Sequence, residues 1–441
     1  MGRLTKPAKV RLAVLAIIIL PVALLAILAS ELASSTSAQL SVLAGNGTSG
    51  TSAAGIPAPL SQLATPMGIT MDRHGNLYIA DSGNNRIEEL AAKTHHQFGI
   101  AMLAQHLYTV AGDGHAGDMG LTGPATRAML NFPTGVAVDQ AGDLFIAGAA
   151  TPIILEVPNH SGMQFGEPMQ SGHIYPVAGR LSEGYQGDGI TATDARLQGP
   201  VGIATDAKGN LYIADSGNNC VQEVAATTHT QYGIRMREGY IYTLLGPMPP
   251  PGSAKADSTS PEPLYSGSMS FPVAVAVDSQ GDLFVAELYG NKIVEVPSHG
   301  GTQFGQAMLP ATPYQIAGGG RSSITSTGEP ALGVGLGAPV SLATDPEGNL
   351  YIASYNTSEI LELVRETHKQ NAVEMGAGDI YTLAGPGDQG IATIDGTATP
   401  LRLSHPVGVA TATGATILIS DYYTNCIFAL DEEPTRPATT S

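Results

Sequence analysis

The stretch Gly75-Asn76-Leu77-Tyr78-Ile79-Ala80-Asp81-Ser82-Gly83-Asn84-Asn85 determines how the rest of this chain is interpreted. Gly75-Asn76 is a turn signal, Leu77 to Ala80 has the pattern of a short strand, and the residues from Asp81 onward form turns. The same eleven residues recur without change from Gly209 to Asn219, and altered copies occur elsewhere. Repeated strand-and-turn units of this kind are typical of repeat architectures.

A proline opens each copy of the unit, and the prolines are almost evenly spaced. Successive spacings are 67, 67, 72, 67 and 67 residues, which gives six units: Pro66, Pro133, Pro200, Pro272, Pro339 and Pro406. A near-constant period of this length predicts that each unit is one supersecondary element stacked on its neighbours.

Each unit contains four strand-like segments, which in the first unit span 68–71, 77–80, 86–90 and 107–111. Four antiparallel strands form one small sheet, and six such sheets arranged radially leave few exposed edges. The sequence therefore predicts an all-β fold, a six-bladed β-propeller of four-stranded blades.

The sixth unit has only three strands before Leu430, and the missing one lies at the other end of the chain. Ser41 to Gly45 matches the fourth strand of the first unit, Tyr108 to Gly112. We expect this N-terminal strand to pair into the last blade and close the ring. The predicted propeller domain spans 39–430, and 431–441 is a polar tail.

Residues 1–38 have the layout of a targeting segment. Four basic residues precede an apolar run from Leu12 to Ala29, which small and polar residues follow. This pattern predicts an N-terminal hydrophobic helix, either a cleaved signal peptide or an uncleaved membrane anchor. Both interpretations place the remainder outside the cytoplasm. The expected location is the cell membrane, through residues 12–29, or the secreted fraction.

The charge balance excludes one class of partner. The formal net charge is −18 at pH 7, and a nucleic-acid-binding protein needs a basic face. We therefore expect no nucleic-acid partner. The expected partner of this monomer is an unidentified protein or a ligand of the cell envelope.

The repeated stretch resembles the NHL repeat. The resemblance rests on Gly75 to Asp81 followed by Asn84 to Ile87, on Gly209 to Val221, and more loosely on the other copies; it covers roughly residues 40–430. It implies a propeller fold. It does not choose a function, because NHL proteins include RNA-binding, adhesion, sensing and lyase members.

The candidate ligand site is the turn that follows the second strand of each blade, expected at the channel mouth. Four of its six aligned positions are acidic: Asp81, Asp215, Glu287 and Asp421, with Gly148 and Ser354 in the other two. These carboxylates could form a rim that binds a cation or a basic group. The alternative is that each one caps its own turn.

The histidines argue against an enzyme. Zinc-dependent lyases among the relatives hold the metal with histidines in the channel, but the strands expected to line it, such as 67–71 and 134–138, contain none. His95, His229 and His368 fall on the outer connections of alternate blades, too far apart to share one metal. We therefore expect no catalytic residue, no metal and no cofactor.

Other repeated positions have structural interpretations. A glutamate recurs in the third strand and a glutamine follows it, and their even spacing indicates a structural or solvated-edge role: Glu89, Glu156, Glu223, Glu295 and Glu362; Gln97, Gln164, Gln231, Gln303 and Gln370. Cys220 and Cys426 share one repeat position in opposite blades, so we expect them to be unpaired.

The linker of residues 247–271 is five residues longer than the others, and it is either a contact site or a neutral insertion. Leu130 and Phe132, next to the second unit-opening proline, are expected to pack between blades. The sequence thus predicts an exported or membrane-tethered propeller that acts as a binding module for sensing or scaffolding. The alternative is a propeller lyase or hydrolase with a site at the channel mouth.

Overall fold

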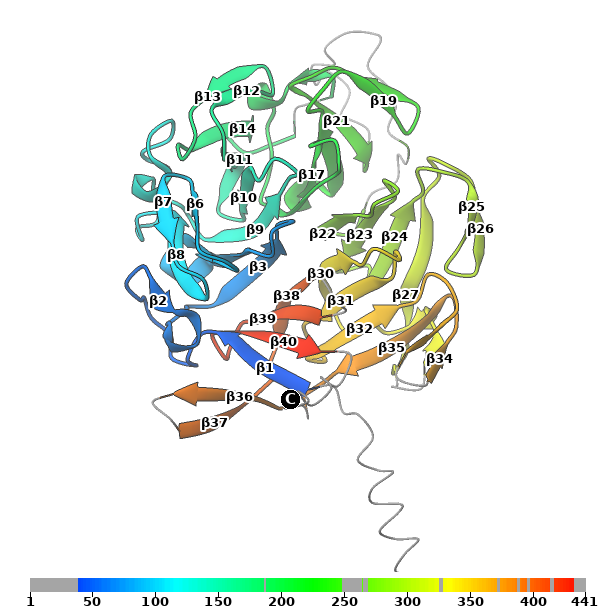
Figure 1. Ribbon diagram of the computed structural model, residues 1–441. Coiled ribbons are helices and arrows are strands. Elements are labelled where there is room, and N and C mark those ends of the chain that lie inside the picture. The colour runs from blue at the N-terminus through cyan, green and yellow to red at the C-terminus, as the bar shows by residue number, and fades with distance from the viewer. Residues whose placement is uncertain are drawn as a thin grey trace, which may run out of the picture.

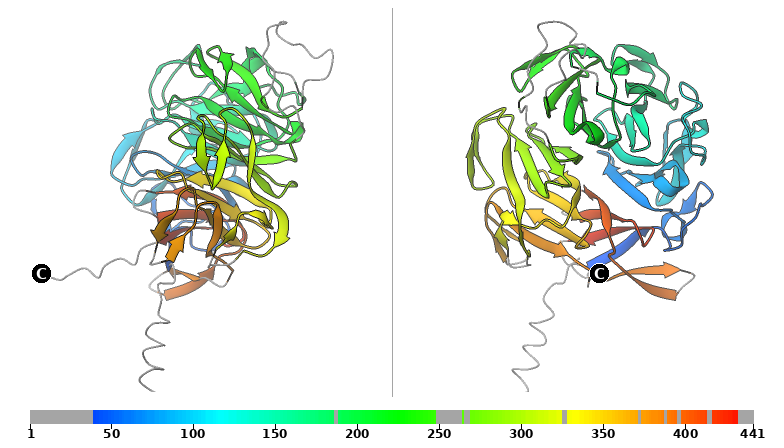
Figure 2. Two further views of the ribbon diagram at one scale, coloured as in Figure 1. Left: turned by 90° about the vertical axis from the view of Figure 1, so that its right-hand side faces the viewer. Right: turned by 180° about the vertical axis from the view of Figure 1, so that it is seen from behind.

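The computed structural model describes residues 39–185, 188–247, 264, 269–324, 328–370, 373–386, 389–394, 397–412 and 416–431. Six sheets are arranged as blades in a ring (Figure 1), and the same ring is seen from the side and from behind in Figure 2. The predicted all-β, six-bladed propeller is confirmed.

Blade 1 shows how one repeat becomes one sheet. Its order from the centre outward is β3 (Pro66–Met71), β4 (Leu77–Asp81), β5 (Arg86–Leu90) and β8 (His106–Ala111), with β2 (Ile56–Pro57) on the outer edge. Neighbouring strands are antiparallel, and Ile69 pairs with Ile79. The four segments expected in this unit are therefore strands close to their predicted limits.

The remaining blades repeat this order, but the sheets contain four to six strands instead of four throughout. From the centre outward, blade 2 has β9 (Pro133–Val138), β10 (Leu144–Gly148), β11 (Thr151–Val157) and β14 (Tyr175–Gly179); blade 3 has β16 (Pro200–Thr205), β17 (Leu211–Asp215), β18 (Cys220–Val224), β21 (Tyr240–Leu245) and β15 (Ile190–Thr191); blade 4 has β22 (Pro272–Val277), β23 (Leu283–Glu287), β24 (Lys292–Val296), β27 (Tyr314–Ser322) and β29 (Leu332–Val334); blade 5 has β30 (Pro339–Thr344), β31 (Leu350–Ser354), β32 (Glu359–Leu363), β35 (Asp379–Ala384) and β28 (Glu329–Pro330); blade 6 has β38 (Pro406–Thr411), β39 (Thr416–Asp421), β40 (Cys426–Asp431), β1 (Gln39–Ala44), β36 (Gln389–Ile394) and β37 (Thr397–Arg402).

A short hairpin, not predicted from the sequence, joins the third and fourth strands of blades 1 to 5. The pairs are β6 (His95–Gln97) with β7 (Ile100–Met102), β12 (Gly162–Gln164) with β13 (Glu167–Met169), β19 (His229–Gln231) with β20 (Ile234–Met236), β25 (Gly301–Gln303) with β26 (Gln306–Met308), and β33 (His368–Gln370) with β34 (Val373–Met375). In blade 1 the turn has Phe98 and Gly99 at positive φ, as a type I′ turn requires. A phenylalanine is a poor signal for that turn. Its ring packs edge-on against Tyr78, 6.3 Å between centroids, so packing outweighs local preference.

The N-terminal strand closes the ring, as predicted. Strand β1 pairs antiparallel with β40 of blade 6, with Leu40 opposite Leu430 and Val42 opposite Phe428. Leu40 and Ala44 are buried. Blade 6 is therefore built from both ends of the described chain, which join the first and last repeats.

One hydrogen bond recurs at the junctions between blades. An Asn or Ser side chain in the turn before the third strand accepts from the backbone N–H of the residue before the next unit-opening proline. The five observed pairs are Asn85 with Phe132, Asn219 with Phe271, Asn291 with Ala338, Ser358 with His405, and Asn425 with Thr65. The last pair crosses the ring closure. We call these contacts the junction bonds.

The two ends predicted from sequence lie mostly outside this description. Residues 1–38, including the apolar run 12–29, and all of the polar tail except Asp431 are not among the described residues. Within the described part, no helix is long and apolar enough to cross a membrane.

Deleting residues 39–45 tests the closure. We expect this deletion to lower the urea midpoint of unfolding substantially, because blade 6 loses an inner strand and the buried Leu40, a side chain worth about 1.5–3 kcal/mol. Deletion of seven residues from the polar segment 432–441 is the control. An unchanged midpoint for the first variant would show that the ring does not depend on β1.

Candidate functional site

The four acidic turn residues predicted from sequence are directed to the linkers of their own blades. In each case a carboxylate oxygen accepts the N–H of the residue 17 positions earlier: Asp81 from Ala64, Asp215 from Gln198, Glu287 from Ser270, and Asp421 from Ser404. All four residues are buried. The carboxylates of Asp81 and Asp215 form no capping bond to the backbone of their own turns, so these two residues hold the linker instead of the turn.

The other oxygens of these carboxylates also have partners within the turn or strand. Asn84 Nδ2 donates to Asp81 at 2.7 Å, Asn218 Nδ2 donates to Asp215 at 2.6 Å, and Lys292 Nζ lies 3.2 Å from Glu287. Burial raises the pKa of Asp81 and of Asp421 to about 6 and that of Asp215 to about 7. At the two non-acidic positions the contact with the linker is different. The Ser354 hydroxyl donates to Leu336 O, and Gly148 lies so close to the linker that an added Cβ would be 3.0 Å from Asn131 O.

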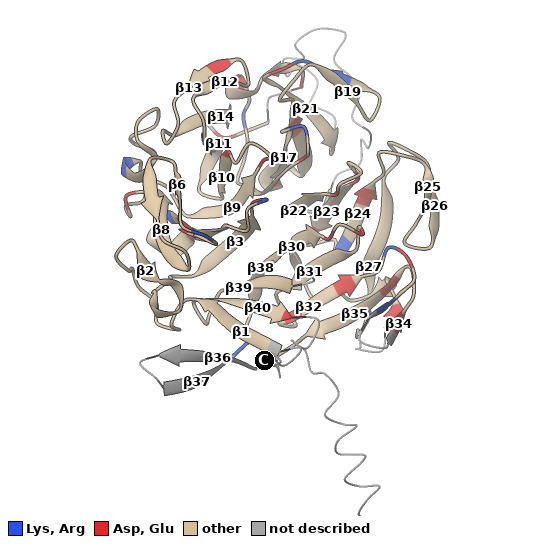
Figure 3. Ribbon diagram, in the orientation of Figure 1, with Lys and Arg blue, Asp and Glu red and all other residues tan. Residues whose placement is uncertain are grey.

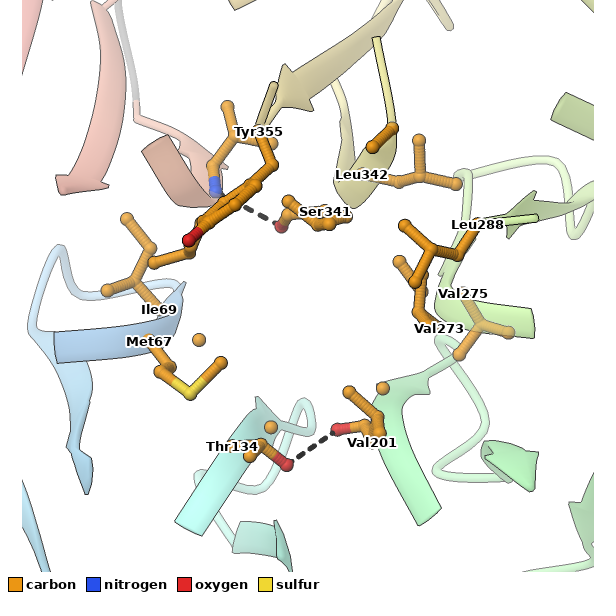
Figure 4. Close-up of a pocket in the computed structure, with 18 of the residues that line it drawn as sticks. Met67, Ile69, Thr134, Val201, Val273, Val275, Leu288, Ser341, Leu342 and Tyr355 are labelled. Atoms are coloured by element: carbon orange, nitrogen blue, oxygen red, sulfur yellow. Dashed lines mark hydrogen bonds between the residues drawn. The ribbon is translucent and has the colours of Figure 1, made fainter. Parts of the chain in front are cut away.

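A cavity lies beside these turns, at the centre of the ring. It has a volume of about 670 Å³ and is lined mainly by the innermost strands, with Met67, Val201, Val273, Val340 and Val407 in its wall (Figure 4). We call it the cup. Thr134 and Ser341 also line it, but their hydroxyls are engaged: Thr134 donates to Val201 O, and Ser341 accepts from Val409 N.

An apolar ring forms the floor of the cup. One residue from each innermost strand lines both the cup and a smaller cavity of about 190 Å³ on the far side: Ile69, Val136, Ile203, Val275, Leu342 and Val409. The smaller cavity is otherwise lined by the far ends of the same strands, such as Thr70 and Thr411. The aliphatic ring thus divides the central channel into two chambers.

The rim of the cup is asymmetric. The two residues after each acidic-turn position are small in blades 1 to 3, where they are Ser82-Gly83, Ala149-Ala150 and Ser216-Gly217. In blades 4 to 6 they are Leu288-Tyr289, Tyr355-Asn356 and Tyr422-Tyr423. Of these twelve residues, Leu288, Tyr289, Tyr355, Asn356 and Tyr422 line the cup. We call the side formed by blades 4 to 6 the aromatic wall.

Contacts among aromatic rings support this wall. The rings of Phe271 and Tyr289 are 5.0 Å apart, and His405 stacks between Tyr355 at 4.7 Å and Tyr423 at 4.8 Å. Tyr289 and Tyr423 are nevertheless 74% and 59% exposed. The aromatic wall therefore presents exposed ring surface at the mouth of the cup.

Phe132 lines the cup on the opposite side, whereas Leu130 is buried in the core. The expectation that both pack between blades therefore holds for Leu130, and Phe132 belongs to the cavity. The rim tyrosines could have been found in the sequence by comparing residues 82–83 with their five counterparts. Most of the long linker 247–271 lies outside the described residues.

Neither chamber is lined by a charged residue or a histidine, within the described part of the chain. Charged residues are scattered over separate blades (Figure 3). No described cluster of three or more His, Cys, Asp and Glu residues has the geometry of a metal site.

The other repeated polar residues lie in the body of the blades. The five glutamates are fully buried, which makes the solvated-edge interpretation wrong for them. His95 Nε2 lies 3.0 Å from Glu89, and His229 Nε2 lies 3.3 Å from Glu223. Gln97 donates to Tyr78 Oη. Cys220 and Cys426 are free, buried thiols in blades 3 and 6, and burial raises the pKa of both, to about 12 for Cys426.

Comparison with known proteins supports the repeat and the fold. Residues 197–223 match the NHL repeat model. Human teneurin-1 is 23% identical over 408 residues, a match that covers 77% of this chain and 13% of teneurin-1. This chain thus spans only a small part of that relative.

Two solved structures from Bacteroides thetaiotaomicron VPI-5482 have a similar fold. An auxiliary nutrient binding protein has a TM-score of 0.53 at 13% identity, with 89% of this chain and 76% of that chain covered. A structural genomics protein of unknown function has a TM-score of 0.52 at 12% identity, with 89% and 75% covered. At these identities the likeness shows the fold alone.

Replacing Asp215 by asparagine tests the structural role of the acidic turn. Because the pKa of folded Asp215 is raised to about 7 from its usual 3.8, the unfolded chain releases this proton at lower pH. This residue therefore makes the folded state less stable as pH rises from about 4 to about 7. We expect Asp215→Asn to gain stability relative to wild type over that range, measured by urea unfolding at several pH values. A difference that does not change with pH would contradict the burial argument.

Proposed function

We propose that this six-bladed β-propeller, which carries an NHL repeat, is a binding module that takes its ligand in the cup. The asymmetry of the rim is the observation that carries this proposal. Packing of the blades requires the repeated residues, but it does not explain Tyr289, Tyr355 and Tyr422 where blades 1 to 3 have serine, glycine and alanine. Tyrosines at these positions on one side of a cavity give it a direction and a shape.

The lining of the cup favours an uncharged, largely apolar ligand. A charged group that entered this cavity would lose its hydration, and none of the described lining residues carries a charge that would compensate for that loss. The volume of about 670 Å³ lies within the range of small-molecule sites. An apolar body would contact Val273, Val340 and Val407, and the amide of Asn356 and the rim tyrosine hydroxyls would meet polar groups at its outer end.

The difference in height around the rim suggests how such a ligand enters. Tyr289 and Tyr355 stand on the aromatic wall, whereas the equivalent positions of blades 1 to 3 are the small Gly83, Ala150 and Gly217, with Phe132 as the large lining residue on that low side. A flat ligand would enter over the low side and lie with its ring against the wall, where offset and edge-on aromatic contacts contribute about 0.5–1.5 kcal/mol each.

The cup supports binding better than catalysis. General acid–base and nucleophilic catalysis need a titratable or nucleophilic group within hydrogen-bond reach of the reacting atom. The described lining contains no Asp, Glu, His, Lys or Cys, so its titratable groups are the phenols of Tyr289, Tyr355 and Tyr422. Its Thr134 and Ser341 hydroxyls are already hydrogen-bonded. An interaction or sensing module is therefore the function we favour over a lyase or hydrolase.

We also propose that the module works outside the cytoplasm, on the basis of the basic and apolar pattern of residues 1–38. N-terminal sequencing of the protein recovered from fractionated cells would distinguish a cleaved signal from an uncleaved anchor. Recovery of the whole protein in the cytoplasmic fraction would contradict this proposal.

A charged residue in the wall of the cup should prevent ligand binding. We expect wild type to increase the fluorescence of the uncharged probe N-phenyl-1-naphthylamine, and Val340→Lys to weaken that binding at least about tenfold, because the ammonium group places a charge against the apolar body of the probe. Leu309→Lys, at a 66% exposed position outside the cup, is the matched control.

Thermal unfolding should show that both variants are folded. Binding of the probe that is equal in Val340→Lys and wild type, or absent from wild type, would refute the cup as a site for apolar ligands.

A further inference from the structure

The face of the propeller opposite the cup has a different chemistry. Each innermost strand ends there before the chain leads back into the second strand, and in blades 1 to 5 the connecting residues include acidic ones. Blades 2 and 4 both have two aspartates in this turn and a buried glutamate in the third strand: Asp139, Asp143 and Glu156 in blade 2; Asp278, Asp282 and Glu295 in blade 4. The two acidic sets occupy the same repeat positions.

In blade 4 a cation from the next blade neutralises the set. Arg365 follows β32 of blade 5 and is buried, 5% exposed. Its Nη1 forms an ion pair with Asp278 Oδ2, and its Nη2 lies 2.9 Å from Asp282 Oδ2. The guanidinium passes over Gly348, where an added Cβ would lie 2.6 Å from Arg365 Cδ and 2.7 Å from Nη1.

In blade 2 the corresponding place has no such side chain. The residue aligned with Arg365 is Ala226 of blade 3, and the glycine aligned with Gly348 is Gly209. A Cβ on Gly209 would lie 3.5 Å from Asp139 Oδ2 and 3.6 Å from the Ala226 methyl group. We call this space, between Asp139, Gly209 and Ala226 and backed by Asp143 and Glu156, the blade 2 notch.

The two blades differ at the aspartates and not at the buried glutamate. Glu156 and its blade 4 counterpart Glu295 are both fully buried with neither oxygen hydrogen-bonded. Asp139 Oδ1 accepts the N–H groups of Ala141 and Asp143, but its Oδ2 has no donor among the described contacts. Both oxygens of Asp143 accept from neutral donors, Oδ1 from Asn159 N and Oδ2 from Gln164 Nε2, so a guanidinium in the notch would share Oδ2 with the Gln164 amide. Burial, then the nearby Asp143 and Asp139, raises the pKa of Glu156 to about 9.

We propose that the blade 2 notch binds a guanidinium group supplied from outside the chain, in the position that Arg365 occupies in blade 4. A planar guanidinium has five N–H donors and suits two carboxylates better than an ammonium does. Asp139 and Ala226 are only half-buried, so the notch is open to solvent. A metal ion is a poorer candidate, since these carboxylates do not converge on one point among the described residues.

The probes are N-acetyl-arginine amide, which represents an arginine within a partner chain, and methylguanidine, which represents a small guanidino compound. Titration calorimetry at low ionic strength should show one site per chain in wild type. N-acetyl-lysine amide should bind at least about tenfold more weakly. Tighter binding of the arginine amide than of methylguanidine assigns the site to a protein partner, and the reverse order assigns it to a small molecule.

Three variants decide whether the notch is the site. Ala226→Arg supplies the guanidinium from blade 3 and should remove binding of both probes. Ala92→Arg, at the same repeat position of blade 1, should change affinity less than about twofold, because the preceding blade has Ala412 and Thr416 in place of the two aspartates. Arg365→Ala should open the blade 4 set and double the number of sites. Binding that survives in Ala226→Arg, equal affinity for the lysine amide, or no binding by wild type would overturn the proposal.

Discussion

The junction bonds are the interaction on which the ring depends. The residue before each unit-opening proline must turn the chain from the linker into the innermost strand, and it does so at positive φ: 45° at Thr65, 50° at Phe132, 55° at Gly199, 57° at Phe271, 66° at Ala338 and 64° at His405. This conformation costs a residue with a side chain on the order of 1–3 kcal/mol. The N–H of each of the five non-glycine residues is held by Asn or Ser from the preceding blade, while the N–H one position earlier is held by the acidic turn in blades 1, 3, 4 and 6.

The same geometry creates the cup. A residue at positive φ presents its side chain in a direction that an extended residue does not, and at three junctions that side chain is aromatic: Phe132, Phe271 and His405. Phe132 lines the cavity, and the other two support Tyr289, Tyr355 and Tyr423 of the aromatic wall. The linker that precedes an innermost strand therefore serves both the scaffold and the candidate site. Its backbone N–H groups are held by the scaffold, and its side chains line the cup or support the aromatic wall.

The sequence was sufficient for the fold because the period of 67 residues and the four strand-like segments per unit reflect local hydrogen bonding and alternation. Strand β1 could be assigned to blade 6 because Ser41 to Gly45 is a copy of Tyr108 to Gly112. Asn85 was recognisable as a turn residue, but its acceptor role was not, since the donor Phe132 lies 47 residues away. The hairpins were missed because Phe98 adopts positive φ only with the packing of its ring on Tyr78.

The candidate site was harder to predict, because residues that build the scaffold recur in every blade whereas the residues of the candidate site differ between blades. Asp81 and its counterparts drew attention by recurring, and their recurrence reflects the linker that every blade must hold. Residues that do not hold a linker can differ between blades, as Tyr289 and Tyr355 do at the cup and as Arg365 and Ala226 do on the opposite face. In the second case the two aspartates are the same in blades 2 and 4, but Ala226 stands beside those of blade 2 where Arg365 pairs with those of blade 4. A residue that differs between blades is therefore the best pointer to a binding site where the residues around it are the same in both blades.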